Sequence, residues 1–385
     1  MEYDLIVIGG GVLGTFHAYH AANAGLRVLL LEKDSRPQQA TVRNFGQVVP
    51  SGMSGRWFEF GRRGLAVYGA LQRQADLSVR QNGSVYIASD ADEQTLLHEL
   101  KARFEAAGYP SELLAPAQIE ARYPVIRADY AREALFFPQE MSVEPNLFIH
   151  RLHAYMQERL PALTLRFGTP VVGCEPLGEG VRVAAAGGLS WTARRVVVCG
   201  GGEFRLLFPE VFRQSGIVTT KLQMMRTVAL PDLPLEGNIL TGLTIRRYES
   251  FQDCPSYRTI QTPDHLQELR RWGVHILFKK AIDGTVIVGD SHEYAGVDDV
   301  DSLGYQQTEY LTELMLREAE RIVSFPVRKL SETWAGFYPQ HPETDVFEYD
   351  LDDRIHLRTA IGGKGMTGSC GYAEAVIGAL FGVYK

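Results

Sequence analysis

The chain has 385 residues, of which 45% are hydrophobic and 22% charged, a composition typical of a globular protein and not of a disordered or fibrous one. Its formal net charge is −7 and it has no run of basic residues, which argues against nucleic acid as the main partner. No apolar stretch is long enough to span a membrane and the N-terminus lacks a signal peptide, so we expect a cytoplasmic protein without a membrane partner. The length favours two domains.

The first 32 residues predict a β-turn-α-β unit. Residues 5–8 are a short apolar run rich in β-branched side chains, as in a strand that is buried on both faces. A G-x-G-x-x-G turn follows, then a helix over residues 15–24 and a second buried strand over residues 26–31 that ends on Glu32.

Each part of this unit suits a dinucleotide. Gly9 permits the tight turn, Gly11 lets the backbone approach a pyrophosphate, and Gly14 lets the helix lie close to the strand. The helix N-terminus offers free N–H groups and a partial positive charge, and Glu32 can accept hydrogen bonds from ribose hydroxyls. We therefore predict a dinucleotide site, with a glycine-rich turn of another α/β protein as the alternative.

A loop over residues 40–46, A-T-V-R-N-F-G, is expected to return toward the nucleotide. Arg43 in this loop can meet a phosphate or a substrate anion, or form a surface salt bridge. Further elements then begin a second domain: helices over residues 57–76, 92–107 and 116–123, and strands over residues 84–88 and 135–138. A helix over residues 145–159 follows them.

Residues 195–202, R-V-V-V-C-G-G-G, predict a buried strand that ends in glycines and returns to the first domain. The excursion over residues 215–325 predicts an antiparallel sheet with one helix. Asp283-Gly284 lies between two alternating apolar runs, which is a strong hairpin signal. The expected strands are residues 221–230, 243–248, 275–280 and 285–289, and the expected helix is residues 303–320.

A second glycine-rich turn, at residues 362–367, leads into a helix over residues 373–381. A nicotinamide dehydrogenase does not need this turn, whereas an enzyme that holds an extended FAD does. The first helix then serves the pyrophosphate, and the second directs its dipole at the isoalloxazine N1–C2=O edge.

We therefore predict an α/β, Rossmann-like FAD-binding domain with a parallel sheet, beside an α+β substrate domain built on an antiparallel sheet. The FAD-binding domain is assigned residues 1–80, 141–214 and 326–385, and the substrate domain residues 81–140 and 215–325. The four cysteines are scattered without C-x-x-C spacing, so we expect reduced thiols and neither a disulfide framework nor a metal site.

Five segments together resemble the D-amino-acid oxidase/sarcosine oxidase/glycine oxidase superfamily of FAD enzymes over essentially the whole chain. That resemblance implies oxidation of a C–N bond by hydride transfer to flavin N5, giving an imine that hydrolyses, with O2 as the usual acceptor and H2O2 as its product. The segments are I-V-I-G-G-G-V-L-G with Glu32, R-N-F-G at residues 43–46, V-V-V-C-G-G-G at residues 196–202, W-A-G-F-Y-P at residues 334–339 and G-G-K-G-M-T at residues 362–367.

Longer motifs resemble one clade of this superfamily, FAD-dependent oxidoreductases associated with phosphonate catabolism. This implies a small anionic amine as substrate, an aminophosphonate related to 2-aminoethylphosphonate. The alternatives are a sarcosine- or glycine-type secondary amino-acid oxidase and a non-catalytic FAD-binding protein. The motifs are A-T-V-R-N-F-G, K-L-Q-M-M-R-T at residues 221–227, R-R-Y-E-S-F at residues 246–251, R-W-G-V-H at residues 271–275 and V-G-D-S-H-E-Y at residues 288–294.

Two departures from the superfamily pattern have consequences. The segment that carries the flavin-linking cysteine of monomeric sarcosine oxidases has Gly336 nearest that position, so we expect non-covalent FAD. The lysine that grips the substrate carboxylate in those enzymes corresponds to Thr367, which puts an amino-acid carboxylate in doubt.

The resemblance and the glycine turns together give a set of cofactor residues. They are Gly9, Gly11, Val12, Leu13, Gly14, Glu32, Lys33, Arg43, Asn44, Phe45, Gly46, Val171, Gly200, Gly201, Gly336, Gly363, Lys364, Gly365, Met366 and Thr367.

The substrate face is expected on the antiparallel sheet, where an anion requires Arg, Lys or His donors. For catalysis, Lys279 matches a lysine that speeds the reaction with O2 in sarcosine oxidases, and His292 or Glu293 can bind or deprotonate the amine. Strand alternation puts Arg246 and Arg247 on opposite faces, and the alternative for each cation is a solvated charge. The residues expected to bind substrate are Gln223, Arg226, Arg246, Tyr248, His275 and Tyr338.

Overall fold

A computed structural model describes residues 1–384 of the chain. The predicted β-turn-α-β unit is present as β1 (Tyr3–Ile8), α1 (Val12–Asn23) and β2 (Val28–Leu31), and β1 and β2 pair in parallel. The returning strand β11 (Ser190–Val198) pairs in parallel with the other edge of β1. The strands β1 and β2 are apolar, as expected for strands that are buried on both faces.

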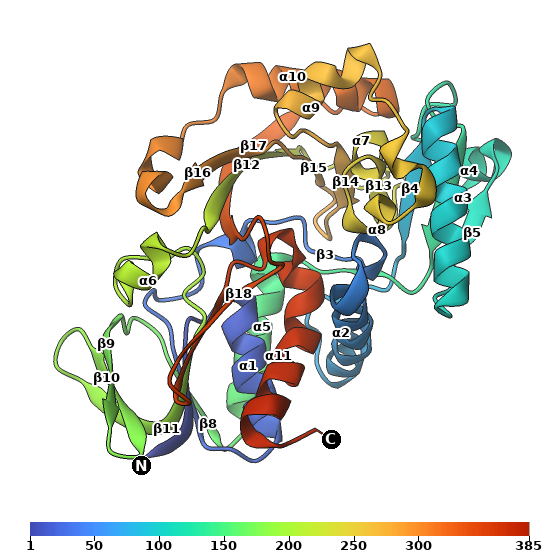
Figure 1. The fold of residues 1–385 in the computed structure, drawn as a ribbon. Coiled ribbons are helices and arrows are strands. Elements are labelled where there is room, and N and C mark those ends of the chain that lie inside the picture. Colours follow the sequence, from blue (N-terminus) through green and yellow to red (C-terminus); the bar gives the residue numbers. More distant parts are fainter. Residues whose placement is uncertain (385) are drawn as a thin grey trace.

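The first sheet has the order β18-β19-β11-β1-β2-β8, with β9 and β10 joined at β11. Figure 1 shows this sheet in the lower half of the molecule, near the N-terminus. Its remaining strands are β8 (Leu163–Arg166), β9 (Val171–Leu177), β10 (Gly180–Ala185), β18 (Phe347–Leu351) and β19 (Ile355–Thr359).

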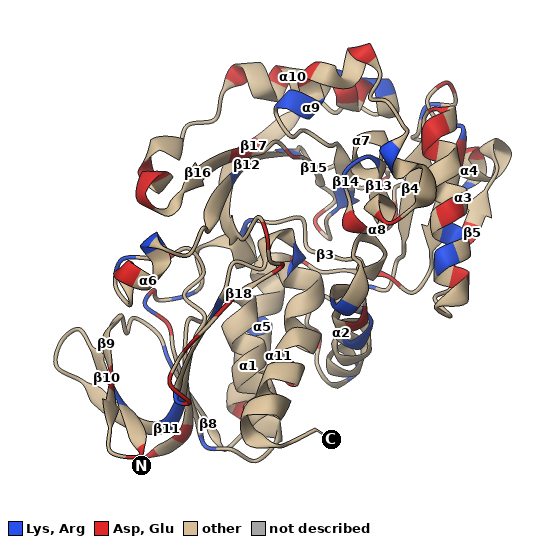
Figure 2. Ribbon diagram, viewed as in Figure 1, with Lys and Arg blue, Asp and Glu red and all other residues tan. Residues whose placement is uncertain are grey.

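Four helices lie beside this sheet: α1, α2 (Gly55–Gln74), α5 (Pro145–Arg159) and α11 (Gly365–Phe381). The helices α1 and α11 carry almost no charge, in contrast to the outer helices in Figure 2. A Cβ at Gly371 would overlap the backbone of Phe60, so α11 and α2 pack backbone to backbone there. The C-terminal helix is therefore part of the FAD-side core.

The second sheet forms the upper half of the molecule and has the order β16-β12-β15-β14-β13-β4-β6-β5, with β17 along β12. The predicted hairpin is confirmed as the antiparallel pair β14 and β15. The strands are β4 (Ser84–Ala88), β5 (Glu112–Leu114), β6 (Glu133–Phe137), β12 (Val218–Thr227), β13 (Asn238–Leu240), β14 (Leu277–Lys280), β15 (Val286–Gly289), β16 (Glu293–Gly296) and β17 (Leu330–Gln340).

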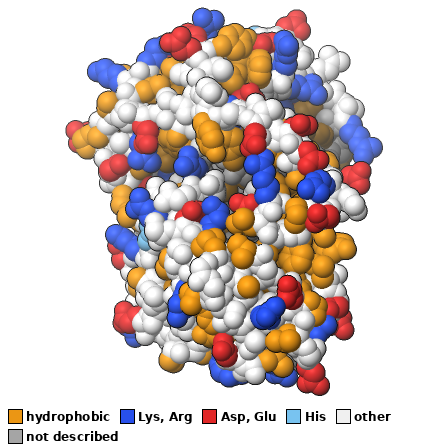
Figure 3. All heavy atoms as spheres, turned by 90° about the vertical axis from the view of Figure 1, so that its left-hand side faces the viewer, with side chains coloured by type: hydrophobic (Ala, Val, Ile, Leu, Met, Phe, Trp, Pro, Cys, Tyr) orange, Lys and Arg blue, Asp and Glu red, His pale blue; other side chains and the backbone are white. Residues whose placement is uncertain are grey.

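Short helices and one small sheet complete the fold, and Figure 1 shows α9 and α10 above the second sheet. No helix within residues 1–384 combines the length and hydropathy needed to cross a bilayer. The face drawn in Figure 3 intersperses acidic, basic and apolar side chains. The elements are α3 (Ala91–Ala106), α4 (Pro116–Arg122), α6 (Pro209–Arg213), α7 (Gly242–Ile245), α8 (Glu249–Gln252), α9 (Gln267–Arg271), α10 (Glu309–Ile322), β3 (Gln47–Val48) and β7 (Met141–Ser142).

Two expectations about these elements are wrong. The strand expected over residues 243–248 is the helical turn α7 and the loop after it, in which the Ile245 and Arg246 N–H groups donate to the Thr241 and Gly242 carbonyls and not to a neighbouring strand. The strand β17 pairs with β12 along its whole length, so residues 330–340 belong to the second sheet and not to the FAD-binding part.

A buried carboxylate, Glu140, joins the two halves beneath the loop that follows β3. Its Oε1 accepts hydrogen bonds from the Ser51 N–H at 2.8 Å and the Tyr109 hydroxyl at 2.9 Å, and its Oε2 accepts one from the Ser51 hydroxyl at 3.0 Å. Burial raises the pKa of Glu140 to about 7, against the opposing effect of the Ser51 hydrogen bonds.

We expect the Glu140→Gln variant to lose part of the pH dependence of folding stability. The folded protein binds a proton at Glu140 that the unfolded chain releases near pH 4.5, so this stabilisation is complete below pH 4.5 and is lost as pH rises through about 7. The free energy of unfolding of wild type relative to the variant should fall by about 2 kcal/mol from pH 5 to pH 8. Denaturant titrations of both proteins measure this difference, and parallel pH curves would contradict it.

Candidate active site

Two cavities of about 600 and 630 Å³ lie between the sheets and share part of their walls. The first cavity runs from the end of β2, at Glu32, to the glycines after β11, and the second runs from the start of α1 to β14 and β15. Residues in the walls of both are Gly11, Ala40, Thr41, Cys199, Gly201, Phe337, Tyr338 and Pro339. Together they form one elongated site with Gly11 and Thr41 at its middle.

The glycines of the first turn have two different roles. Gly9 has φ +110°, and a Cβ there would overlap the carbonyl oxygen of Cys199. A Cβ at Gly14 would overlap the carbonyl oxygen of Gly9, so Gly14 permits close helix–strand packing and lines neither cavity. Gly11 lines both cavities, and a Cβ there would meet the Thr41 hydroxyl at 3.0 Å.

Glu32 is fixed at the wall of the first cavity by backbone donors. Its Oε2 accepts a hydrogen bond from the Gly10 N–H at 2.7 Å, and its Oε1 accepts one from the Asp34 N–H at 2.9 Å. Each oxygen keeps a second lone pair, which is what a ribose hydroxyl requires.

Two helix N-termini face the second cavity. The N-cap residues of α1 and α11 are Gly11 and Lys364, and neither makes a side-chain cap hydrogen bond. In α1 the Val12 N–H donates to the Thr41 hydroxyl at 2.9 Å. The Lys364 ammonium pairs with Glu249 at 2.5 Å and Asp345 at 3.3 Å, which ties α11 to the upper half. The Thr367 hydroxyl accepts a hydrogen bond from the Val49 N–H at 3.0 Å.

The residues expected to hold the cofactor therefore fall on one continuous wall, apart from Gly14. An extended dinucleotide would fit this shape, with the start of α1 available for its pyrophosphate and the start of α11 for its ring. Those in the first cavity are Gly9, Gly11, Glu32, Lys33, Val171, Gly200 and Gly201. Those in the second are Gly11, Val12, Leu13, Arg43, Asn44, Phe45, Gly46, Gly201, Gly336, Gly363, Lys364, Gly365, Met366 and Thr367.

A polar cluster closes the sheet side of the second cavity. Three of the expected residues, Tyr248, His275 and Tyr338, line this cavity, as does His292. The His275 and His292 rings stack with centroids 5.4 Å apart. Asp290, the residue after β15, lies between them and was not singled out from the sequence, although it directly follows an apolar strand.

Two guanidinium groups lie in the wall of this cavity: that of Arg43, which donates to the Gln38 and Ala335 carbonyls, and that of Arg247, which lies near Asp290. Arg247 Nη2 donates to the Tyr294 hydroxyl at 3.2 Å and its Nη1 to the Gly273 carbonyl at 3.4 Å. No carboxylate within residues 1–384 lies at ion-pairing distance from it, although Asp290 is near enough to support its charge. The sequence named Arg247 as a candidate but favoured Arg246 as the substrate contact.

The choice of Arg246 is wrong. Arg246 is held by Asp90 at 2.6 Å and Glu93 at 2.8 Å, and it lines neither cavity. The physical reason is the helical turn α7, which replaces the expected strand and directs Arg246 toward α3 and Arg247 toward the cavity.

Three further expectations fail because the side chains lie away from the cavities. Arg226 pairs with Asp283 at 3.7 Å. The Gln223 amide donates to the Thr312 hydroxyl at 2.6 Å, beneath α10. Glu293 pairs with Lys221 at 3.5 Å on the β12–β16 edge.

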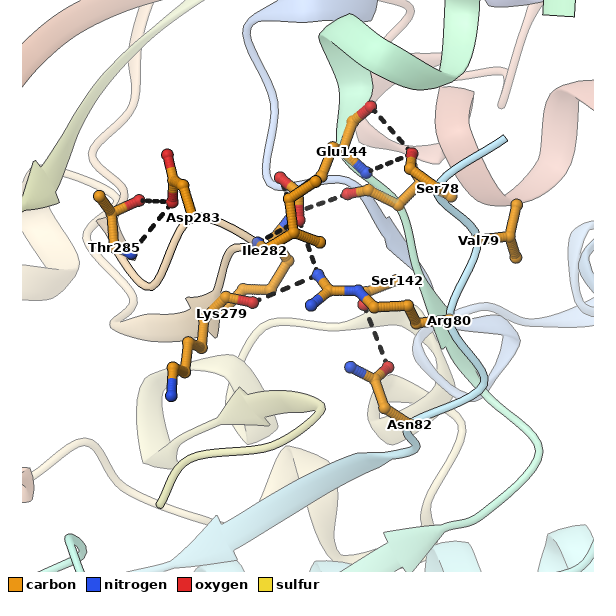
Figure 4. A network of polar contacts seen from close by, with 12 residues as sticks. Ser78, Val79, Arg80, Asn82, Ser142, Glu144, Lys279, Ile282, Asp283 and Thr285 are labelled. Carbon is orange, nitrogen blue, oxygen red and sulfur yellow. Dashed lines mark hydrogen bonds and ion pairs between the residues drawn. The ribbon is translucent and has the colours of Figure 1, made fainter. Parts of the chain in front are cut away.

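Lys279 also lines neither cavity, contrary to its expected role beside the flavin. Its ammonium donates to the Val143 carbonyl at 2.6 Å and approaches Glu144 Oε2 at 3.4 Å. Figure 4 shows the surrounding network, in which Arg80 also pairs with Glu144 at 2.6 Å. Burial lowers the pKa of Lys279 to about 8, and Glu144 opposes this shift. Lys279 therefore joins β14 to the start of α5.

The parallel sheet, the glycine turn and the second helix N-terminus define a dinucleotide-dependent oxidoreductase. The chain matches the model of the family described as FAD dependent oxidoreductase (DAO) over residues 4–378. It belongs to this family, and FAD is its cofactor.

Relatives and solved structures agree with this family. N-methyl-L-tryptophan oxidase of Yersinia pestis is 28% identical over 269 residues, 69% of this chain and 66% of that protein, so the chain matches just under two thirds of that relative's length. L-proline dehydrogenase from P. horikoshii (TM-score 0.81, 16% identity) and glycine oxidase from Geobacillus kaustophilus (0.78, 16%) have the same fold. Both alignments cover 100% of this chain, and 94% and 95% of those chains.

We expect the Lys279→Met variant to lower stability but not chemistry. It leaves the buried Glu144 with Arg80 as its remaining ion-pair partner, so the free energy of unfolding should fall by about 1–3 kcal/mol. Lys280→Met is the matched control, because the Lys280 ammonium bonds only to the loop carbonyls of Pro231 and Leu233. Denaturant titration and anaerobic flavin reduction measure the two effects. A loss of reduction rate or reoxidation rate specific to the Lys279 variant would restore its expected role.

Proposed function

We propose that this enzyme oxidises the C–N bond of a small anionic amine, an aminophosphonate related to 2-aminoethylphosphonate, and passes the electrons to O2. The observation that carries the proposal is Arg247, a guanidinium in the wall of the second cavity without a carboxylate at ion-pairing distance within residues 1–384. An unpaired guanidinium in a confined site favours an anionic ligand, and its planar donor fork suits phosphonate or carboxylate oxygens.

FAD, when bound, supplies the acceptor for the hydride that leaves the carbon next to nitrogen. The chain's residues hold the substrate and manage its proton. The His292 Nδ1–H donates to the Gly273 carbonyl at 2.8 Å, because a carbonyl can only accept, and this leaves the Nε2 lone pair for the cavity. Burial lowers the pKa of His292 to about 3, so the imidazole is neutral before substrate binds.

Tyr248, Tyr294 and Tyr338 add hydroxyl groups around Arg247, and a tetrahedral anion has more oxygen atoms for such donors than a carboxylate has. Burial raises the pKa of Tyr248 above its usual range, so this hydroxyl keeps its proton. The phosphonate assignment rests on the motif resemblance and on this donor set. The named relatives act on amino acids, so an amino-acid oxidase of the sarcosine or glycine kind is the rival.

We propose non-covalent attachment of FAD. Gly336 occupies the position expected for a linking cysteine, and its Cβ would stand 3.0 Å from the Arg43 carbonyl, so the backbone there is closely packed. Among the four cysteines, Cys199 alone lines the cavities, where β11 passes Gly9.

Anaerobic flavin reduction tests the function. Purified enzyme is mixed with 2-aminoethylphosphonate and its N-methyl derivative, and with sarcosine, glycine and D-proline. We expect an aminophosphonate to bleach the flavin fastest, and admission of air to restore the colour quickly. Reduction by the amino acids alone would refute the phosphonate assignment, slow reoxidation would refute O2 as acceptor, and no bleaching at all would refute the enzymatic function.

Replacement of Arg247 tests the anion contact. In the Arg247→Met variant we expect the apparent Kd of the reactive anionic amine to rise about 100-fold, the effect of losing a charge-assisted hydrogen-bonded pair. Reduction by an amine of similar size that has no anionic group, such as propylamine, should change less than about threefold. Equal losses for the amines with and without an anionic group would show that Arg247 does not bind the anion.

A further inference from the structure

Three buried side chains form a compact group at the second cavity that cofactor binding does not explain. Asp290 Oδ1 lies 2.9 Å from His275 Nε2 and 3.7 Å from His292 Nδ1. All three residues are at least nine-tenths buried. Despite these approaches, Asp290 Oδ1 accepts no well-aligned hydrogen bond, because neither ring N–H points along the line to it.

A hydrogen bond to a carbonyl fixes where the hydrogen of His292 lies. His292 carries its hydrogen on Nδ1, which donates to Gly273, and presents Nε2 to the cavity. His275 Nδ1 lies 3.2 Å from the Thr244 hydroxyl, and its Nε2 lies 2.9 Å from Asp290 Oδ1. One carboxylate thus faces two imidazoles, and the lone pair of His292 Nε2 is available to the cavity.

The charges around Asp290 come from every element that packs against it. The imidazoles of His275 and His292 and the guanidinium of Arg247 favour its ionised form, and the hydroxyls of Tyr248 and Tyr338 stand close to it. Burial by itself raises the pKa of Asp290, but these neighbours outweigh burial and lower it below its usual range. Asp290 and Arg247 therefore bring one negative and one positive charge to this end of the cavity wall.

We propose that His275, Asp290 and His292 form the amine subsite, which binds the substrate as its ammonium form and removes one proton from the nitrogen. This inference rests on the proposed function and narrows the substrate class to zwitterions, with the anion at Arg247 and the cationic nitrogen at Asp290. His292 is the catalytic base, and Asp290 and His275 are positioning residues.

The proton balance is simple. The ammonium N–H bond breaks and its proton forms a bond with the Nε2 lone pair of His292. The electron pair of that bond stays on nitrogen, which becomes the neutral amine that C–N oxidation requires. The resulting imidazolium carries its charge 3.7 Å from Asp290, whose carboxylate opposes the effect of burial on the pKa of His292.

A divalent cation is the competing occupant, because one ligand atom from each of these three residues lies within 4.8 Å of the others. The hydrogen bond from His292 Nδ1–H to the Gly273 carbonyl leaves Nε2 as the one nitrogen of this ring that can either ligate a metal ion or accept a proton. Metal analysis of the purified protein separates the two occupants.

The experiment measures flavin reduction anaerobically from pH 6 to pH 10, with the fastest amine among 2-aminoethylphosphonate, its N-methyl derivative, sarcosine, glycine and D-proline. We expect the flavin of the Asp290→Asn variant to be reduced about 30-fold more slowly than that of wild type at pH 7. The acidic side of its profile of reduction rate against pH should move up by about one pH unit. Near pH 10, where the dissolved amine is largely neutral, the variant should recover to within about threefold of wild type.

Two companion variants sharpen this comparison. His275→Asn should shift the acidic side of the pH–rate profile in the same direction by a smaller amount. If the Asp290→Asn variant fails to retain FAD, the profile of His275→Asn tests the amine subsite in its place. Asp283→Asn is the matched control, because that carboxylate lies on the turn of the same hairpin and pairs with Arg226 outside the cavity. Its profile should follow wild type.

Several outcomes would overturn the inference. They are a pH profile of Asp290→Asn identical to wild type, a loss of rate that is the same at every pH, and a stoichiometric divalent metal whose removal abolishes reduction. Failure of the proposed function is a separate result, since the wild-type flavin would then be reduced by none of the five amines.

Discussion

The site depends on a backbone contact among β1, α1 and β11. The turn at Gly9 lies against the Cys199 carbonyl, and α1 begins against Gly9 because Gly14 has no side chain. This contact sets the N-terminus of α1 where the two cavities meet, and the same strand, β11, leads into the glycines of the first cavity. A side chain at Gly9 or Gly14 would separate α1 from the sheet and remove the pyrophosphate end of the site.

Ion pairs between buried and half-buried side chains join the upper half to the cofactor side. Lys279 and Arg80 meet Glu144 at the start of α5, and Lys364 at the start of α11 meets Glu249 on α8. Each pair joins an element of the second sheet region to a helix of the cofactor side. Cations of the upper half therefore have different surroundings: Arg246 pairs with Glu93 and Lys279 with Glu144, whereas Arg247 has no carboxylate at ion-pairing distance within residues 1–384.

Much of the fold could be predicted because it follows from local pattern. The β1-α1-β2 unit and the β14–β15 hairpin have periodicity and turn residues that admit few alternatives. The secondary structure of residues 243–248 could not be predicted from the local pattern, because a six-residue run of apolar and polar side chains suits a strand or a helical turn equally. Packing against α3 and the Thr241 hydroxyl bond to the Ile276 carbonyl decide for the helical turn.

The sequence by itself predicted a dinucleotide site at Gly9 to Gly14 and a second glycine turn, Gly362 to Thr367, on the same cofactor, because the spacing of glycines is visible along the chain. Only the tertiary structure decided which of the many cations and acids reach the cavity. Asp290, Arg247 and His292 come together there, while Arg226, Arg246, Lys279 and Glu293 are neutralised elsewhere. The reason is that ion-pair partners such as Glu93 and Glu144 are more than 100 residues away along the chain, so their effect exists only after folding.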